Sequence, residues 1–421
     1  MKSKSLQEIG KFFCNFIKSV FFLVLIVPCN SASGQSANEE FPDFNSAAMT
    51  SPDVFRYLNM HFGSEIVDSV KLVALGEVSH GGYTPIAFKA QMVKYLVVKK
   101  EYRSLLIEGP DYIISKMRNY LNSPEVLDTS FISKWVKDLD LNEPSSTIYL
   151  KLFSWLKQYN IQNKHNPVEV FGFDIGIDQR FVNFILYRYI TPYNLQETQS
   201  LIYKLATENS FIEQIEVLND WFNLNQPNLK AKLDNREFNW LSFYLRTADN
   251  SIKYDRKNSN NNISTKISAN LFRDSVLYQN VQFLSQNVKS IIWAHNAHVV
   301  AAGFKNMGNF LRERYKKSYF VIATDFPKLA TVHILDSNSM SKGKFSYSIK
   351  SFTADPSSAA RKLFENYNIS QGIFSIQKLK DLGIKANINA IDNYGHQFVF
   401  PAEKNIINAL IIFSDVNLSS H

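Results

Sequence analysis

Short runs of apolar and β-branched residues recur along the chain, and helical patterns separate most of them. Runs of this length and composition are typical of strands that are buried on both faces of a sheet. Six such runs occur at residues 71–75 (KLVAL), 104–107 (SLLI), 168–171 (VEVF), 290–293 (SIIW), 319–323 (YFVIA) and 409–413 (ALIIF). Their alternation with helical segments predicts an α/β fold with a largely parallel central sheet flanked by helices.

The helical segments show where the chain departs from simple alternation. Thr84 and Pro85 form a good start for a helix that runs to about Lys100, and residues 270–284 form another. Between about residues 180 and 270 the strand signal fades and helical patterns dominate. We therefore expect a helical insertion or subdomain in this part of the chain.

The first 34 residues have the pattern of a secretory signal peptide. Four lysines precede an apolar run of eight residues at 20–27, and small residues follow it. Such a run is too short to span a bilayer. We expect a secreted or periplasmic protein whose catalytic domain comprises residues 35–421, with no membrane span after cleavage. Cys29 follows Pro28 where a lipoprotein signal requires a small residue, so lipid anchoring at Cys29 is not expected.

Charge and cysteine content exclude several classes of function. The signal region accounts for +3 of the chain's net charge of +8, and the remaining +5 is mild and spread out. We therefore expect no nucleic-acid partner. Both cysteines, Cys14 and Cys29, lie in the signal region. Residues 35–421 consequently offer no disulfide, cysteine nucleophile or cysteine metal ligand.

Polar side chains follow directly after the predicted strands. In a parallel sheet, ligands bind at the carboxyl ends of the strands. The residues at these positions are Glu77 and His80, Glu108, Asp174, His295 and His298, and Asp325. Because each follows an apolar run that does not itself require a polar residue, we interpret them as candidate site residues.

A lysine on the first long helix adds a second indication. Lys89 falls on the apolar stripe of that helix, among Ile86, Met92, Val93 and Val97. An inward lysine requires an anion or a carboxylate partner. The alternative is that its stem lies along the apolar surface while its ammonium reaches solvent.

Three motifs together resemble the erythromycin esterase family. Residues 76–82 (GEVSHGG) resemble its GExxHG segment, Glu108 follows His80 at the family's spacing, and residues 295–298 (HNAH) resemble its second signature. Arg273-Asp274 and the GFD ending at Asp174 also fit. The resemblance covers roughly residues 50–415, and the combination of motifs is fairly specific.

The resemblance implies an ester hydrolase without a cofactor, in which His80 is the general base that activates water. Ester hydrolysis by water requires a base with a pKa near neutrality, which imidazole supplies. A nearby carboxylate such as Glu108 would orient His80. The further catalytic candidates that the family implies are Glu77, Glu108, Lys89, His295 and His298. Of these, His295, His298 or Lys89 would stabilise the tetrahedral intermediate. Asp174, Arg273 and Tyr83 are the candidates for substrate binding.

The sequence also departs from the family. The family typically places an acidic residue and then aromatic residues after its HGT segment, whereas this chain has residues 82–88 (GYTPIAF) there. Lys89 replaces the usual arginine and lacks its bidentate geometry. The resemblance therefore implies ester hydrolysis, with a small-molecule ester as partner, more directly than it implies a macrolide lactone substrate.

Two alternatives remain open at this point. The three histidines and two glutamates at the strand ends could instead hold a zinc or manganese ion. A haem- or metal-binding envelope protein of related architecture is the alternative function. The chain contains no G-x-S-x-G, H-E-x-x-H, P-loop or dinucleotide fingerprint. These absences argue against a nucleophile elbow and against the common nucleotide sites.

Overall fold

The structure is a computed structural model that describes most residues of the chain. These are residues 41–44, 52–138, 143–193, 198–208, 210–259, 262–301, 305–336, 346–400 and 407–418. The predicted signal peptide lies outside them. None of the described helices is both long and apolar enough to cross a membrane.

A seven-stranded sheet lies at the centre of the described residues. Its strands follow the order β3-β2-β4-β1-β5-β11-β8, and β8 is antiparallel to its neighbour whereas the others are parallel. The bounds are β1 Leu72–Glu77, β2 Ser104–Pro110, β3 Glu169–Asp174, β4 Ser290–His295, β5 Tyr319–Asp325, β11 Ala409–Ile412 and β8 Gly372–Ser375. The six apolar runs coincide with β1, β2, β3, β4, β5 and β11, so the predicted α/β fold is confirmed.

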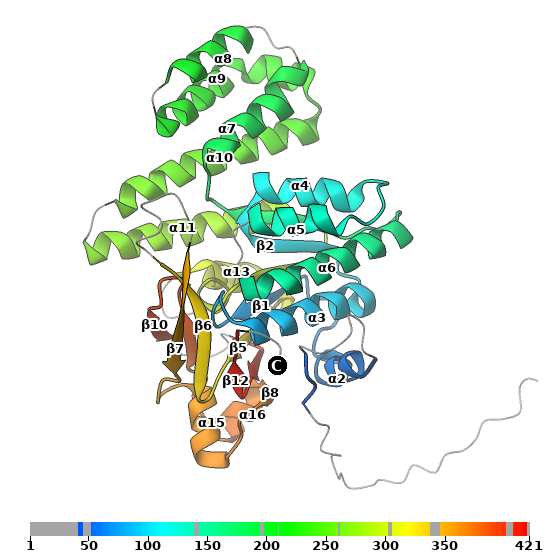
Figure 1. Cartoon of the computed structure of the whole chain (residues 1–421), viewed down its shortest axis with the longest axis vertical. Helices are drawn as coiled ribbons and strands as arrows, with labels where there is room; N and C mark the ends of the chain where they lie inside the picture. Colours follow the sequence, from blue (N-terminus) through cyan, green and yellow to red (C-terminus); the bar gives the residue numbers. More distant parts are fainter. Residues whose placement is uncertain are drawn as a thin grey trace, which may run out of the picture. The chain divides into compact units, whose positions relative to one another are not determined.

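Helices cover both faces of this sheet because side chains of each strand alternate between two apolar cores (Figure 1). Val73 and Leu75 of β1 belong to the core beneath the early helices, whereas Leu72 and Ala74 belong to the other core. The first core packs against α2 Pro52–Phe62, α3 Tyr83–Lys100, α5 Thr129–Asp138 and α6 Glu143–Gln162. The second core packs against α11 Ile263–Leu284 and α13 Met307–Tyr315, and α4 Asp111–Asn122 contributes to both.

The described residues between β3 and β4 contain helices and loops only. The main helices are α7 Gln179–Ile185, α8 Thr198–Thr207, α9 Phe211–Lys232, α10 Asn235–Asn258 and α11. Short π and 3-10 turns, Leu186–Ile190 and Thr191–Tyr193, follow α7. This stretch is the expected helical insertion, extended by α11, which leads back into the sheet at β4.

Two small sheets follow the central one and were not predicted. One has the order β12-β6-β7, with β6 Leu329–Leu335, β7 Tyr347–Thr353 and β12 Asp415–Val416. The other pairs β9 Ile388–Ile391 with β10 Gln397–Phe400, and α15 Ala359–Tyr367 and α16 Ile376–Asp381 accompany them. These strands are short or, like β6, alternate between buried and exposed positions, so they carry no continuous apolar run.

The order of the strands places a switch point between β1 and β4. The chain leaves β1 through α3 on one face towards β2, and it leaves β4 through α12 Asn296–Val299 and α13 on the other face towards β5. In open α/β sheets the crevice at such a point is where ligands bind. Residues 78–82 follow β1 there, and Gly76 at the end of β1 lies directly beside Asn296 at the start of α12.

The loop at residues 78–83 is held by strands that are distant in sequence. The Ile391 N–H donates to the Val78 carbonyl over 2.8 Å, the His333 N–H to Gly81 over 3.3 Å, and the Tyr83 N–H to Asn417 over 2.7 Å. A Cβ atom at Gly81 would collide with the backbone of His333. Glycine at position 81 thus permits the close approach of β6 that fixes this loop.

We predict that Gly81→Ala lowers the free energy of unfolding by about 1–3 kcal/mol, because β6 must move to admit the methyl group. Urea unfolding of the two proteins measures the difference. Gly176→Ala is the matched control, since the nearest atom to its added Cβ is 4.0 Å away. Equal losses for the two variants would contradict the proposed packing.

Candidate functional site

The predicted strand-end residues lie together at the carboxyl ends of the parallel strands. Glu77 and His295 are paired in register at the ends of β1 and β4, and Asp174 pairs with Pro110 at the end of β2. Glu108 accepts a hydrogen bond from the backbone N–H of His295 over 2.9 Å, which joins β2 to β4. The parallel arrangement therefore brings together side chains that are up to about two hundred positions apart in sequence.

Glu77 stands between a buried lysine and a histidine. Its Oε2 atom forms an ion pair with the Lys89 ammonium, and its Oε1 lies 2.8 Å from the Nδ1 atom of His80. The side chains of Lys89 and Glu77 are 0% and 2% exposed. Lys89 also donates to the Ala294 carbonyl over 3.2 Å and lies over the Trp293 ring. The alternative that Lys89 reaches solvent is therefore wrong.

Burial sets the charge balance of this group. It lowers the pKa of Lys89 well below the ordinary 10.5, and the negative charge of Glu108 acts in the opposite direction. Glu77 provides a counter-charge within the same apolar surroundings. A buried ion pair holds only if its geometry and its remaining hydrogen bonds are satisfied. Here Ala294 and His80 supply those further bonds.

His80 is oriented by Glu77 and not by Glu108, the carboxylate that the sequence suggested for this role. Because Nδ1 faces the carboxylate, a neutral His80 carries its proton on Nδ1 and leaves a lone pair on Nε2. The side chain is 28% exposed. Burial lowers its pKa from 6.5, and the charges of His298 and Arg273 add to this, whereas Glu108 and Asp174 oppose it. His80 is thus an unprotonated base at neutral pH.

His295 lies against His80 but engages both of its nitrogens with the backbone. The ring centroids are 4.9 Å apart. Its Nδ1 accepts from the Ala297 N–H over 3.2 Å, and its Nε2 donates to the carbonyls of Val78 and Ile391. Burial lowers its pKa to about 3. His295 therefore remains neutral, and its ring packs against the ring of His80.

His298 has the opposite charge state because carboxylates face both of its nitrogens. Nδ1 lies 2.6 Å from Asp274, and Nε2 lies 3.2 Å from Glu108. Burial alone would lower its pKa, but these two carboxylates raise it to about 10. His298 is therefore a fixed imidazolium that donates to both acids.

Arg273 completes this charged group. Its guanidinium donates to both oxygens of Asp174, over 3.0 and 2.6 Å, and to Glu108 over 3.2 Å. Burial opposes both charges, yet Asp174 raises the pKa of Arg273, while His298 and Arg273 hold that of Glu108 well below 4.5. The result is a network of ion pairs in which positive and negative side chains from β2, β3, α11 and α12 alternate.

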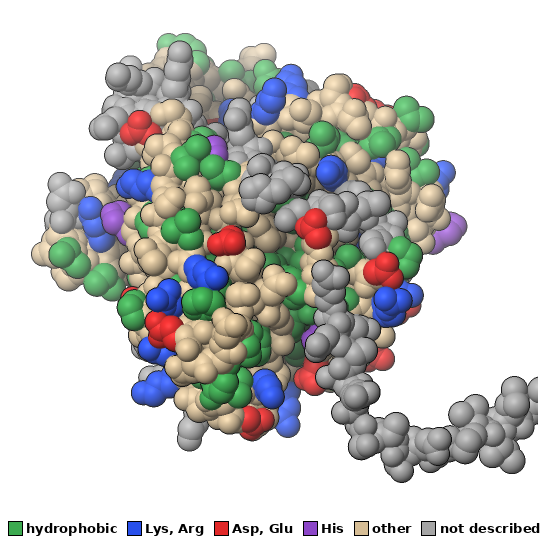
Figure 2. Space-filling view, turned by 60° about the horizontal axis from the view of Figure 1, so that its bottom comes forward, with side chains coloured by type: hydrophobic (Ala, Val, Ile, Leu, Met, Phe, Trp, Pro, Cys, Tyr) green, Lys and Arg blue, Asp and Glu red, His purple; other side chains and the backbone are tan. Residues whose placement is uncertain are grey.

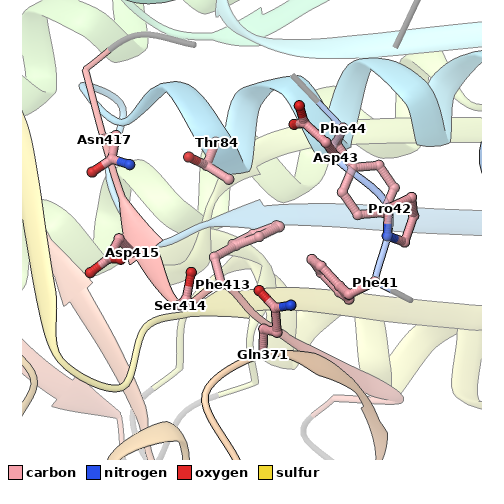
Figure 3. A pocket seen from close by; sticks show the side chains of 10 residues that line it. All are labelled: Phe41, Pro42, Asp43, Phe44, Thr84, Gln371, Phe413, Ser414, Asp415 and Asn417. Carbon is pink, nitrogen blue, oxygen red and sulfur yellow. The ribbon is translucent and has the colours of Figure 1, made fainter. Parts of the chain in front are cut away.

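Tyr83 is not part of this network of ion pairs. It is buried at the start of α3 within the apolar core beneath the early helices. Beside it, Thr84 lines a pocket of about 200 Å³ that contains none of the predicted site residues. Figure 3 shows the rings of Phe41, Phe44 and Phe413 gathered apart from the polar side chains of Thr84, Asp415 and Asn417.

Sequence reasoning did not assign a role to two residues that support the site. Asp274 holds the His298 ring through Nδ1. It could have been found in the sequence because it follows Arg273, a residue that fits the family pattern, near the middle of α11. Asp325, whose pKa burial raises to about 7, accepts from Asn389 over 2.8 Å. This bond anchors β9, which carries the Ile391 carbonyl that His295 contacts.

Within the described residues, no group of three or more His, Cys, Asp or Glu side chains has the geometry to hold a metal ion. On the face seen in Figure 2, lysine and arginine are mixed with acidic side chains and do not form a single basic patch.

We predict that Asp274→Asn lowers the pKa of His298 by about 1–3 pH units, because one of its two negative partners is lost. Since the pKa is raised on folding, His298 stabilises the fold fully below pH 6.5 and loses this contribution as the pH rises through about 10. Urea unfolding across this range should show a shallower decline in the variant. Exposed Asp68→Asn is the control, and parallel curves for Asp274→Asn and wild type would contradict the assignment.

Comparisons with known proteins identify one matching family model and several structures of similar fold. The erythromycin esterase family model matches residues 145–341, which include Asp174, Arg273, His295 and His298. A comparison with curated proteins found no match.

Three solved structures have a similar fold. A Bacillus cereus protein has a TM-score of 0.65 at 20% identity, covering 90% of this chain and 95% of its own. A succinoglycan biosynthesis protein has a TM-score of 0.65 at 17% identity, covering 88% and 94%. A mutant of the erythromycin esterase EreC, in its open conformation, has a TM-score of 0.60 at 16% identity, covering 87% and 95%. Residues 145–341 therefore match the erythromycin esterase family model, and the fold resembles that of a solved erythromycin esterase.

Proposed function

We propose that this protein hydrolyses carboxylic esters by activating water with His80. The observation that carries the proposal is the arrangement Lys89–Glu77–His80, in which a buried carboxylate fixes the proton of the imidazole on Nδ1. Nε2 is then the basic atom, on a side chain that is partly open to solvent. A general base needs this combination of a fixed tautomer, access to water and a pKa below neutrality.

The proton moves through His80 in both halves of the reaction. Nε2 takes a proton from water as the oxygen of that water attacks the ester carbonyl carbon. When the carbon–oxygen bond to the alcohol breaks, His80 returns the same proton to the departing oxygen. Glu77 remains ionised throughout and stabilises the imidazolium that forms between the two steps.

Two cations are available to stabilise the tetrahedral intermediate. Arg273 and His298 each lie close enough to His80 for their charges to lower its pKa. A substrate carbonyl next to His80 is therefore within the same electrostatic reach, and these charges are already in place before its oxygen becomes negative. Arg273 is also 21% exposed, so its guanidinium can approach a substrate.

Lys89 and His295 act as positioning residues in this proposal. The Lys89 ammonium is fully buried against Glu77, and the nitrogens of His295 are occupied by the backbone. Lys89 holds Glu77 in its ionised form, and His295 restricts the His80 ring. Catalytic contact with the substrate then falls to His80 and Arg273, whereas His298 acts through its charge, and Glu108 and Asp174 hold the two cations.

A macrolide lactone is the first substrate to test, because the family and one structural neighbour carry the name erythromycin esterase. The family match does not favour the haem- or metal-binding alternative. We propose further that residues 1–34 direct secretion and that residues 35–421 form the catalytic domain. These parts of the proposal rest on the signal pattern and on the strand-end motifs.

We predict that His80→Asn reduces kcat/KM for ester hydrolysis by about 10²–10⁴-fold, because the general base is lost while the fold is kept. Steady-state rates measure the first effect, and urea unfolding measures the second. The exposed His165→Asn, at the opposite edge of the sheet, is the matched control. Turnover that persists in His80→Asn would exclude water activation by His80.

We predict that the purified mature protein adds one water to a macrolide within a panel of 14- and 16-membered rings, and that a chelator leaves the rate unchanged. Mass spectrometry of the substrate follows the reaction. Sensitivity to chelator would replace the metal-independent mechanism with a metal-assisted one. No mass change across the panel would place the substrate outside the macrolides.

A further inference from the structure

The amino-terminal half of α11 presents apolar side chains to solvent. Ile263 is 77% exposed and Ile267 is 55% exposed. At 100° per residue, these two isoleucines fall on the same stripe of the helix as Asn270 and Asp274. Asp274 faces His298 within the site. The stripe that faces the site thus continues beyond it and ends in two uncovered isoleucines.

One tyrosine lies close to this stripe of α11. The hydroxyl of Tyr254, on α10, donates to the Asn270 side chain over 3.4 Å, so it borders the stripe. Burial raises the pKa of Tyr254, while the charge of Arg273 lowers it and that of Asp174 raises it.

The helical rise gives the distance of each isoleucine from the site along the axis of α11. With a rise of 1.5 Å per residue, Ile267 lies about 10 Å along the axis from Asp274, and Ile263 about 16 Å from it. Exposed single apolar residues are common on protein surfaces and need no explanation. Two isoleucines one turn apart, on the stripe that leads into a polar site, are better matched to a ligand that occupies both.

We propose that Ile263, Ile267 and Tyr254 form an apolar rim that binds the apolar body of the substrate, so that the site selects esters with an extended hydrocarbon portion over small esters. This inference rests on the proposed ester hydrolysis, because it assigns the rim to the substrate of the same site. The occupant is the substrate chain, since the stripe is continuous with Asp274 and His298 through a single rigid helix.

Binding of n-alkyl methyl ketones tests the rim without requiring turnover, because a ketone carries the carbonyl but no leaving group. We expect the affinity of wild type in calorimetric titration to rise about two- to fourfold per added methylene from butanone upwards. The rise should level off once the chain exceeds the reach to Ile263. In the double variant Ile263→Asn/Ile267→Asn the dependence on chain length should be lost.

Val67→Asn is the matched control, since Val67 is also half exposed but precedes β1, at the amino-terminal end of the strands and away from the site. It should bind each ketone as wild type does. Affinity that is independent of chain length, or a double variant that binds like wild type, would overturn the rim. A concentration-dependent dimer in sedimentation that the double variant abolishes would assign the isoleucines to self-association and would equally overturn it.

Hydrolysis of p-nitrophenyl acetate and decanoate separates the rim from the proposed chemistry. We expect kcat/KM to be higher for the decanoate in wild type, and the double variant to keep the acetate rate while losing that preference. No hydrolysis of either ester, with chain-dependent ketone binding retained, would refute the esterase and leave the rim as an apolar ligand site. Equal rates on both esters in wild type would refute the rim and leave the esterase.

Discussion

The buried ion pair between Lys89 and Glu77 is the constraint on which the site depends. It places a carboxylate at the end of β1 in apolar surroundings, where an unpaired charge would be severely destabilising. Breaking such a pair from one side typically costs about 3–5 kcal/mol, because the remaining charge loses its partner. The role of His80 follows from this arrangement, since Glu77 fixes its proton on Nδ1 and leaves Nε2 as the basic atom.

Three histidines acquire three different charge states from their surroundings. His295 lies among backbone carbonyls in a dry environment and stays neutral, whereas His298 lies between two carboxylates and stays positive. His80 has one carboxylate partner and partial exposure, and burial lowers its pKa from 6.5, so its ring is neutral and its Nε2 can accept a proton. The same side chain therefore serves as a support, a fixed cation and a base, and the partners of each ring determine which.

The central sheet positions the strand ends, and the late part of the chain positions the loop that carries His80. Backbone bonds from β6, from β9 and from residue 417 close around residues 78–83, and the packing of Val78 against Phe326, Val332 and Ile391 fills the space beneath. Asp325 and Asn389 connect this support to β5. A short motif thus depends on segments more than 200 residues away for its conformation.

The sequence by itself determined the fold class, six strands of the central sheet and the set of polar residues at their ends. It could do so because a strand buried on both faces must be continuously apolar, which makes each polar residue after it conspicuous. The small sheets escaped this reasoning because their strands are short or half-buried, and half-buried alternation over a few residues is weak evidence.

Only the tertiary structure decided which polar groups pair with which. The sequence offered Glu108 as the partner of His80 and left Lys89 between an inward and an outward orientation. The structure joined Lys89 and His80 through Glu77 and joined His298 to Glu108 and Asp274. Strand order caused this outcome, because β4 lies between β1 and β2 and separates Glu77 from Glu108. Strand order depends on long-range packing of the whole chain, which local patterns in the sequence do not encode.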